Sequence, residues 1–139
     1  MADVDDLLSD HRIRTVPPDP AEAAALLRAP TKHLSAARAI ITIDTAGAYV
    51  LAYDAARKSI TAHMLDNGLA ASSGQGAHTV VGEYGETLGD PVFGSFEQMR
   101  RNRNRSEDGT REFSESEVES AIAAAEAMRV AVADLLESE

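Results

Sequence analysis

The stretch DTAGAYVLAYDAARKSITAHMLDNG, residues 44–68, decides the fold class of this chain. Asp44 or Thr45 can cap the start of a helix. Asn67 followed by Gly68 supplies the stop, because glycine readily adopts the left-handed conformation just after a helix. Between these signals, apolar side chains recur at the spacing of one helical face at Leu51, Ala55 and Ala62. The segment therefore predicts a long helix with clear ends.

A helix is also expected upstream of this segment. Asp19 can cap it, Pro20 suits its first position, and Glu22 completes an Asp-x-x-Glu capping box. Pro30 is expected to end or kink the helix, because proline lacks the backbone N–H and clashes with the preceding turn. A continuation is then expected from Thr31.

Further helical patterns follow downstream. Residues 77–88 form one, in which Gly82 and Gly85 indicate close backbone packing. Another helix is expected to open with Ser95 and Gln98 in a capping box.

The last helix is predicted to begin at Ser114, with Glu117 in the capping-box position and Phe113 and Val118 as a hydrophobic staple. Residues 68–76, GLAASSGQG, are expected to form a flexible loop. No alternation typical of a β-strand and no internal repeat is visible. Together these patterns predict an all-α, up-and-down bundle of four to five helices.

The chain has 139 residues, the ordinary size of one domain. Residues 1–19 are interpreted as an N-terminal arm, because three prolines interrupt HRIRTVPPDP at 11–20, and residues 20–139 as a single bundle domain. The absence of cysteine excludes a disulfide scaffold, thiol catalysis and a Cys-ligated zinc site. The acidic N-terminus, and apolar runs far shorter than the ~20 residues that span a bilayer, lead us to expect a cytoplasmic protein.

Charge is distributed unevenly. The formal net charge of −10 argues against a protein that coats nucleic acid by bulk electrostatics. However, four of the 13 basic residues fall in the hexamer RRNRNR, residues 100–105. This local basic cluster in an acidic chain is the strongest candidate for a functional site.

The arginines of this hexamer fall into two rows on the predicted helix. Arg103 shares a face with Phe96 and Met99, so it should point inward and be either partly buried and paired or at the edge of a cleft. Arg101 and Arg105, spaced i and i+4, form an outer row. Two interpretations stay open: ion pairs with nearby acidic residues (Glu112, Glu115, Glu117), or a phosphate or nucleotide site, since planar guanidinium groups match phosphate oxygens.

The four histidines are scattered and show no metal-ligand spacing, so neither a metal site nor a cofactor is expected. His78, at the start of the helix predicted over residues 77–88, could supply an imidazole to the arginine cluster. Alternatively, its side chain caps that helix or packs against a neighbouring element. His63 is expected at the surface or at its boundary.

Three stretches of the sequence resemble one family. The string MRRNRNRSEDG at 99–109, the helix AYVLAYDAARKSITAHML at 48–65 and GAHTVVGE at 76–83 are similar to a mainly actinobacterial branch of the HEPN superfamily. The late motif of that branch usually reads Arg-Asn-x-x-Glu-Tyr, where this chain has RNRSED at 103–108. The resemblance covers roughly residues 12–137.

The resemblance implies an up-and-down helical bundle that often dimerises. Many HEPN proteins are metal-independent endoribonucleases that act as toxins in toxin–antitoxin or phage-defence systems, and some pair with a nucleotidyltransferase-like antitoxin. By position, Arg103 and Asn104 match the Arg-Asn pair and Glu107 matches the glutamate. Asp108 stands where a ribonuclease of this superfamily has His and where this branch commonly has Tyr.

Asp108 weakens the catalytic interpretation. An aspartate titrates near 3.9, whereas the histidine that would handle protons titrates near 6.5, and a carboxylate repels phosphate. The resulting hypothesis is a non-catalytic HEPN module that binds RNA, a nucleotide or a partner protein. The alternatives are a metal-independent endoribonuclease and a purely structural helical dimer.

The residues of these hypotheses form two sets. The candidate catalytic set is Arg103, Asn104 and Asp108. The candidate RNA- or phosphate-binding set is Arg100, Arg101, Arg103, Arg105 and His78. A homodimer is predicted whose interface includes the helix that carries the arginines, because the apolar face of that helix is short.

Overall fold

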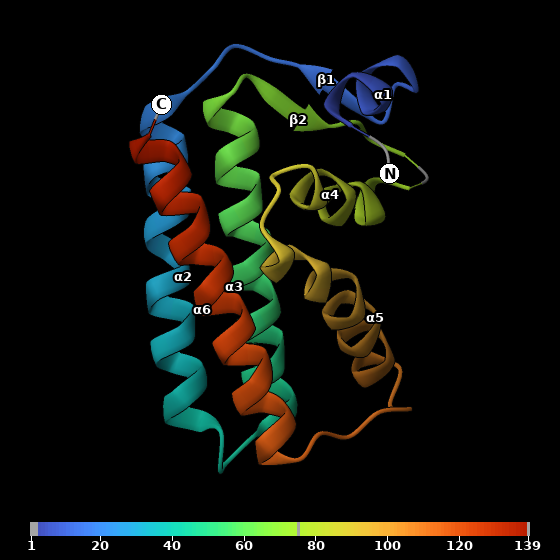
Figure 1. Cartoon of the computed structure of the whole chain (residues 1–139). Coiled ribbons are helices and arrows are strands. Elements are labelled where there is room, and N and C mark those ends of the chain that lie inside the picture. The colour runs from blue at the N-terminus through green and yellow to red at the C-terminus, as the bar shows by residue number, and fades with distance from the viewer. Residues whose placement is uncertain (1–2, 75, 139) are drawn as a thin grey trace.

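The computed structural model describes residues 3–74 and 76–138, without the side chain of His78. Over this part of the chain it contains six α-helices, one 3-10 helix and two short strands (Figure 1). In chain order the elements are α1 (Val4–Ser9), β1 (Ile13–Thr15), α2 (Pro20–Ile40), α3 (Thr45–Asp66), β2 (Leu69–Ala71), α4 (Ala77–Glu86), η1 (Pro91–Ser95), α5 (Phe96–Glu107) and α6 (Glu115–Glu137). The all-α class is confirmed, with a short additional helix, α1, in the segment interpreted as an arm.

Helix α3 is the centre of the fold and contacts α2, α4, α5 and α6. In Figure 1, α2, α3 and α6 lie side by side, and α2 runs in the opposite direction to the other two. Alanines at positions 48, 52, 55 and 56 are fully buried along α3, and such small side chains allow the neighbouring helices to approach closely. The Asp44 side chain accepts from the Gly47 N–H at 2.8 Å, and Gly68 has a φ of 71°. The predicted start and stop of this helix are confirmed.

Helix α2 continues through Pro30, so the expectation that this proline ends the helix is wrong, whereas the alternative of a kink stays a prediction. The helix is continuous from Pro20 to Ile40, and Pro30 lies inside it and is buried. A proline in a helix interior costs about 3 kcal/mol through the missing hydrogen bond and the steric clash. Leu34 and Ala37 are buried one and two turns later, so packing against the bundle continues past the proline and outweighs its local cost.

The N-terminal segment is docked onto the bundle by a small sheet. Strands β1 and β2 pair antiparallel, with Ile13 opposite Ala71, so the expectation of a flexible loop over 68–76 is wrong at Leu69–Ala71. Leu7 is buried, and Arg12 forms an ion pair with Glu83 of α4. The assignment of residues 1–19 as an arm separate from the bundle stays a prediction.

Helix α4 packs closely through its glycines, as predicted. A Cβ on Gly82 would lie 3.0 Å from a ring carbon of Phe96 in α5, and one on Gly85 would lie 3.1 Å from Cδ1 of Ile60 in α3. These contacts hold α4 across the junction of α3 and the start of α5.

The three predicted capping boxes had different outcomes. At α2, the Asp19 side chain accepts from the Glu22 N–H at 3.0 Å, but the Asp19 N–H donates to the Leu65 carbonyl and not to Glu22, so only half of that box is formed. At α6, the Ser114 hydroxyl accepts from the Glu117 N–H at 3.1 Å, and Glu117 accepts from the Ser114 N–H, so that box is confirmed. At α5 it is wrong, because η1 leads directly into the helix and holds Ser95 in a helical conformation, with φ −77° and ψ −16° and no side-chain cap. None of the helices over the described residues is both long and apolar enough to cross a bilayer.

Candidate nucleic-acid interface

Helix α5 is anchored to α3 by its apolar edge. Phe96 and Met99 are buried, and the Phe96 ring stacks on Tyr53 with their centroids 5.3 Å apart. This anchor sets the rotation of α5 and so determines which arginines turn inward and which face solvent.

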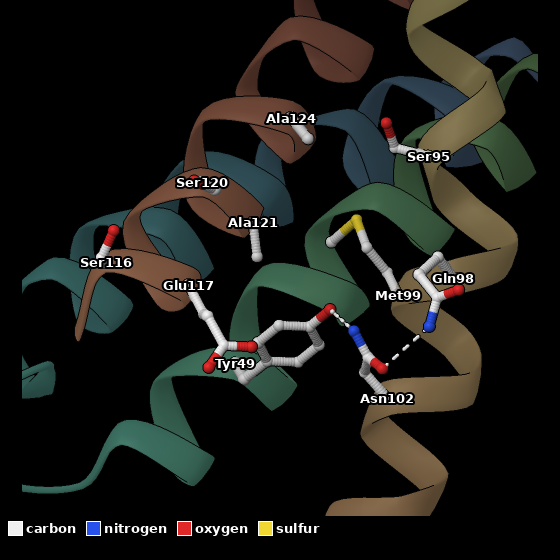
Figure 2. Close-up of a pocket in the computed structure, with 10 residues that line it drawn as sticks. All are labelled: Tyr49, Ser95, Gln98, Met99, Asn102, Ser116, Glu117, Ser120, Ala121 and Ala124. Carbon is white, nitrogen blue, oxygen red and sulfur yellow. Dashed lines mark hydrogen bonds between the residues drawn. The ribbon is translucent and has the colours of Figure 1, made fainter. Parts of the chain in front are cut away.

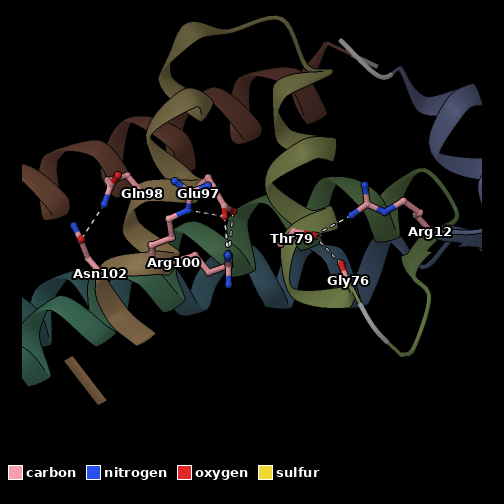
Figure 3. Close-up of polar contacts among 8 residues, drawn as sticks. Arg12, Gly76, Thr79, Glu97, Gln98, Arg100 and Asn102 are labelled. Carbon is pink, nitrogen blue, oxygen red and sulfur yellow. Dashed lines mark hydrogen bonds and ion pairs between the residues drawn. The ribbon is translucent and has the colours of Figure 1, made fainter. Parts of the chain in front are cut away.

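Arg100 and Arg103 form an inner row, and each of them forms an ion pair with an acidic residue of the same helix. The Arg100 guanidinium donates to both oxygens of Glu97, at 2.7 Å and 3.0 Å (Figure 3). This hydrogen bond is the main reason why the pKa of Glu97 is lowered and that of Arg100 raised. Arg103 donates to Glu107 at 3.0 Å.

Arg103 also contacts the core. Its guanidinium carbon lies 5.8 Å from the centre of the Tyr53 ring, within cation–π range. Its Nε is buried and makes no hydrogen bond to any residue that the structure describes. The expectation that Arg103 points inward and is partly buried and paired is confirmed.

The acidic partners differ from those considered in the sequence. Arg100 and Arg103 pair with Glu97 and Glu107, whereas Glu117 pairs with Arg111. Residues three or four apart on one helix are already neighbours, so acids within α5 reach the arginines before acids beyond its end can do so. The exposed residues Glu112 and Glu115 are not part of these pairs.

Arg101 and Arg105 form the outer row. The Arg101 side chain is 63% exposed, against 17% for Arg100, and its Nε lies 3.3 Å from the same Glu97 carboxylate that Arg100 already holds in two hydrogen bonds. Arg105 is exposed and has no ion-pair partner among the described side chains. The outer row therefore presents two guanidinium groups to solvent.

The remaining motif residues lie at the end of α5. Asn104 is exposed, and its side-chain oxygen is 3.4 Å from a guanidinium nitrogen of Arg103. Asp108 is exposed and follows the last residue of the helix as its C-cap. The side chain of His78 lies outside the described residues, so the structure does not place it relative to the arginines.

His63 is buried, which corrects the expectation of a position at the surface or at its boundary. Its Nδ1 lies 2.8 Å from the Tyr84 hydroxyl, and burial lowers its pKa. Along α3 it is ten residues from Tyr53, about 15 Å at 1.5 Å per residue. Its imidazole is thus a core group and does not belong to the arginine cluster.

A groove of about 380 Å³ lies between α5 and α6 (Figure 2). Within it, Gln98 Nε2 donates to Asn102 Oδ1 at 2.9 Å, and Asn102 Nδ2 donates to the Tyr49 hydroxyl at 3.0 Å. Sequence reasoning missed this groove, because Tyr49 is 53 residues away from Asn102. The one local signal was the i, i+4 spacing of two amides, Gln98 and Asn102, on one face of α5.

Two groups set the electrostatics of the groove. Burial raises the pKa of the Tyr49 hydroxyl, which therefore stays protonated at neutral pH. The pKa of Glu117 is lowered, first by the hydrogen bond from the Ser114 backbone and also by Arg111, so the groove has a carboxylate in its wall.

Over residues 3–74 and 76–138, no three His, Asp or Glu side chains lie close enough together to hold a metal ion. No protein-family model matches this chain, and neither a curated protein nor a solved structure shows significant similarity to it.

Proposed function

We propose that this chain is a non-catalytic, HEPN-like helical module that binds single-stranded RNA through the outer row, Arg101 and Arg105. The observation that supports this proposal is the division of the α5 arginines. Arg100 and Arg103 are held by Glu97 and Glu107, whereas the outer row faces solvent with one shared, longer contact.

Exposed arginines suit a phosphate ligand. A guanidinium group is always charged and offers planar donors that match phosphate oxygens. Arg101 and Arg105 are four residues apart, so their side chains lie next to each other along one helical edge. The acidic remainder of the chain, with a net charge of −10, keeps affinity modest and restricts binding to this edge.

Asp108 is the reason for proposing binding without cleavage. By the family resemblance it occupies the position of the histidine that moves protons, and it is an exposed carboxylate. A carboxylate there repels the phosphate that the arginines attract. Among the histidine side chains that the structure describes, His63 is buried and gives no substitute for that imidazole. Because of Asp108, the proposal favours binding over the endoribonuclease and its toxin–antitoxin role.

Salt-dependent binding tests the proposal. Each phosphate contact to a single strand contributes ~0.7 to the slope of log affinity against log salt, so two arginines predict a slope of about −1.4. The measurement is fluorescence anisotropy with a labelled single-stranded RNA between low and physiological salt. Absence of binding at low salt, or a flat slope, would contradict the proposal.

A parallel incubation with RNA in EDTA separates binding from cleavage. We expect the RNA to stay intact. New RNA ends that disappear with Arg103→Ala would instead favour the metal-independent endoribonuclease. The homodimer through α5 stays a prediction, and light scattering at micromolar concentration tests it.

A further inference from the structure

The groove between α5 and α6 is not used by the proposed phosphate contacts. Gln98 and Asn102 of α5 form one wall, Ala121 and Ala124 of α6 form the other, and Tyr49 of α3 lies between them (Figure 2). Its volume of about 380 Å³ is at the lower end of the roughly 300–1,000 Å³ that small-molecule sites occupy. The groove is therefore large enough for a ligand of nucleoside size.

The polar wall of the groove is held in a fixed orientation. Gln98 donates to Asn102, and Asn102 donates to the hydroxyl of Tyr49, which is itself buried and stacked on Phe113 with the ring centroids 4.0 Å apart. A primary amide has two N–H donors and a carbonyl acceptor, so each amide keeps unused hydrogen-bonding capacity after these contacts. The groove thus offers preorganised, planar donors and acceptors.

The charge of the groove selects against an anion inside it. The Glu117 carboxylate lies in the wall and is paired with Arg111. A phosphate would meet this carboxylate, whereas a neutral ring with amino and imine groups would not be repelled. The ligand that fits the groove is therefore uncharged, planar and rich in hydrogen-bonding groups.

On the surface of α5, the outer row lies beside the amide wall of the groove. Arg101 follows Gln98 by three residues, and Arg105 follows Asn102 by three residues, so each arginine is a neighbour of one amide on the helix surface. A strand whose phosphates contact the arginines would have its bases next to the groove. Proteins that read single-stranded RNA commonly take up unstacked bases and bind their edges.

We infer that the groove binds one unstacked adenine of the RNA strand, with the amides of Gln98 and Asn102 reading the edge of the base. Asn and Gln side chains pair with adenine through its N6 amino group and N7, as donor and acceptor together. This inference rests on the proposed function for the contacts between the RNA phosphates and the outer row. The base, however, is assigned to the groove, which those phosphate contacts do not use.

The test uses uncharged nucleosides, so that it does not depend on the arginines. Adenosine, guanosine, cytidine and uridine are titrated into the ¹⁵N-labelled full chain, and the side-chain amide signals of Gln98 and Asn102 are followed by NMR. Gln98→Ala assigns one of the two signals. We expect adenosine to shift both signals to saturation and to bind at least about fivefold more tightly than uridine, the lower limit of the discrimination by one well-placed amide pair.

Two matched variants of α6 locate the site. Ala124→Leu fills the groove and should weaken adenosine binding about tenfold or more, whereas Ala123→Leu, on the exposed side of the same helix, should leave it unchanged. Gln98→Ala, which removes an exposed side chain and no core contact, should reduce the preference for adenosine over uridine. The melting temperatures of all variants establish that they are folded.

Three results would overturn the inference: no nucleoside shifts the amide signals, all four nucleosides bind equally, or Ala124→Leu binds adenosine like the wild type. Salt-dependent RNA binding without any nucleoside response would overturn the base site alone. A saturable adenosine response without salt-dependent RNA binding would support the base site and overturn the proposed phosphate contacts.

Discussion

Helices α3 and α5 pack against each other but are used differently. Most of α3 is enclosed by its neighbours, with five alanines fully buried, and its polar groups Ser59 and His63 are buried and hydrogen-bonded. Helix α5 buries only Phe96 and Met99 fully, holds Arg100 and Arg103 in a partly buried inner row, and exposes its outer row to solvent. Helix α3 therefore belongs mostly to the core, whereas α5 is fixed at its apolar edge and carries polar and charged residues over the rest of its surface.

The largest stability effect should come from removing the anchor of α5. Phe96 is fully buried, stacks on Tyr53 and lies against Gly82. Phe96→Ala should lower the free energy of unfolding by about 3–5 kcal/mol, because it removes a buried aromatic ring and leaves a cavity. Urea denaturation measures this change. A loss below about 1 kcal/mol would mean that α5 does not depend on this contact.

A pair of substitutions, one in α3 and one in α5, compares how much each helix contributes to stability. Ala56 of α3 is fully buried, and Ala56→Leu should cost about 1–3 kcal/mol through overpacking. Asn104 of α5 is exposed, and Asn104→Leu should change stability by no more than about 0.5 kcal/mol. Equal effects of the two substitutions in urea denaturation would contradict the division between a core helix and a surface helix.

The buried histidine of α3 should make stability depend on pH. Burial lowers the pKa of His63 below its usual value of 6.5, so the unfolded chain takes up a proton before the folded chain does. The contribution of neutral His63 to the free energy of unfolding is complete above pH 6.5, and it is lost as the pH falls through the lower pKa of the folded state. The urea midpoint should therefore decrease on acidification below pH 6.5, and His63→Gln should flatten this part of the profile. An unchanged slope in the variant would assign the pH dependence to other groups.

Local rules predicted the parts of the fold that depend on neighbouring residues. The ends of α3 and the capping box at Ser114 follow from side chains within three or four positions of each other. Pro30 shows the limit of such rules, because burial of Leu34 and Ala37 keeps α2 continuous. Packing of α2 against the rest of the bundle keeps the helix continuous there. Such packing cannot be predicted from residues that are neighbours in the sequence.

Features that depend on distant residues escaped sequence reasoning. Strands β1 and β2 have three residues each, too few for an alternating pattern, and they exist because Ile13 meets Ala71. The groove joins Tyr49 to Asn102 across 53 positions. At the arginines, the sequence predicted two rows but did not predict that Glu97 and Glu107 would occupy the inner one.

The smallest effect on stability is expected at the outer row. Arg101→Ala with Arg105→Ala removes exposed side chains, and exposed ion pairs contribute only about 0–1 kcal/mol. The melting temperature should stay close to that of the wild type. A large decrease would show that these arginines support the fold, as in the purely structural interpretation.

The most direct test of an RNA site at the outer row is RNA binding by this double variant. Binding is measured by fluorescence anisotropy at low salt beside a charge-matched control. The control is Arg28→Ala with Arg38→Ala, two exposed arginines of α2. We expect the outer-row variant to lose RNA binding and its salt dependence, while the control retains both. Equal binding by the two variants would contradict the assignment of the RNA site to α5.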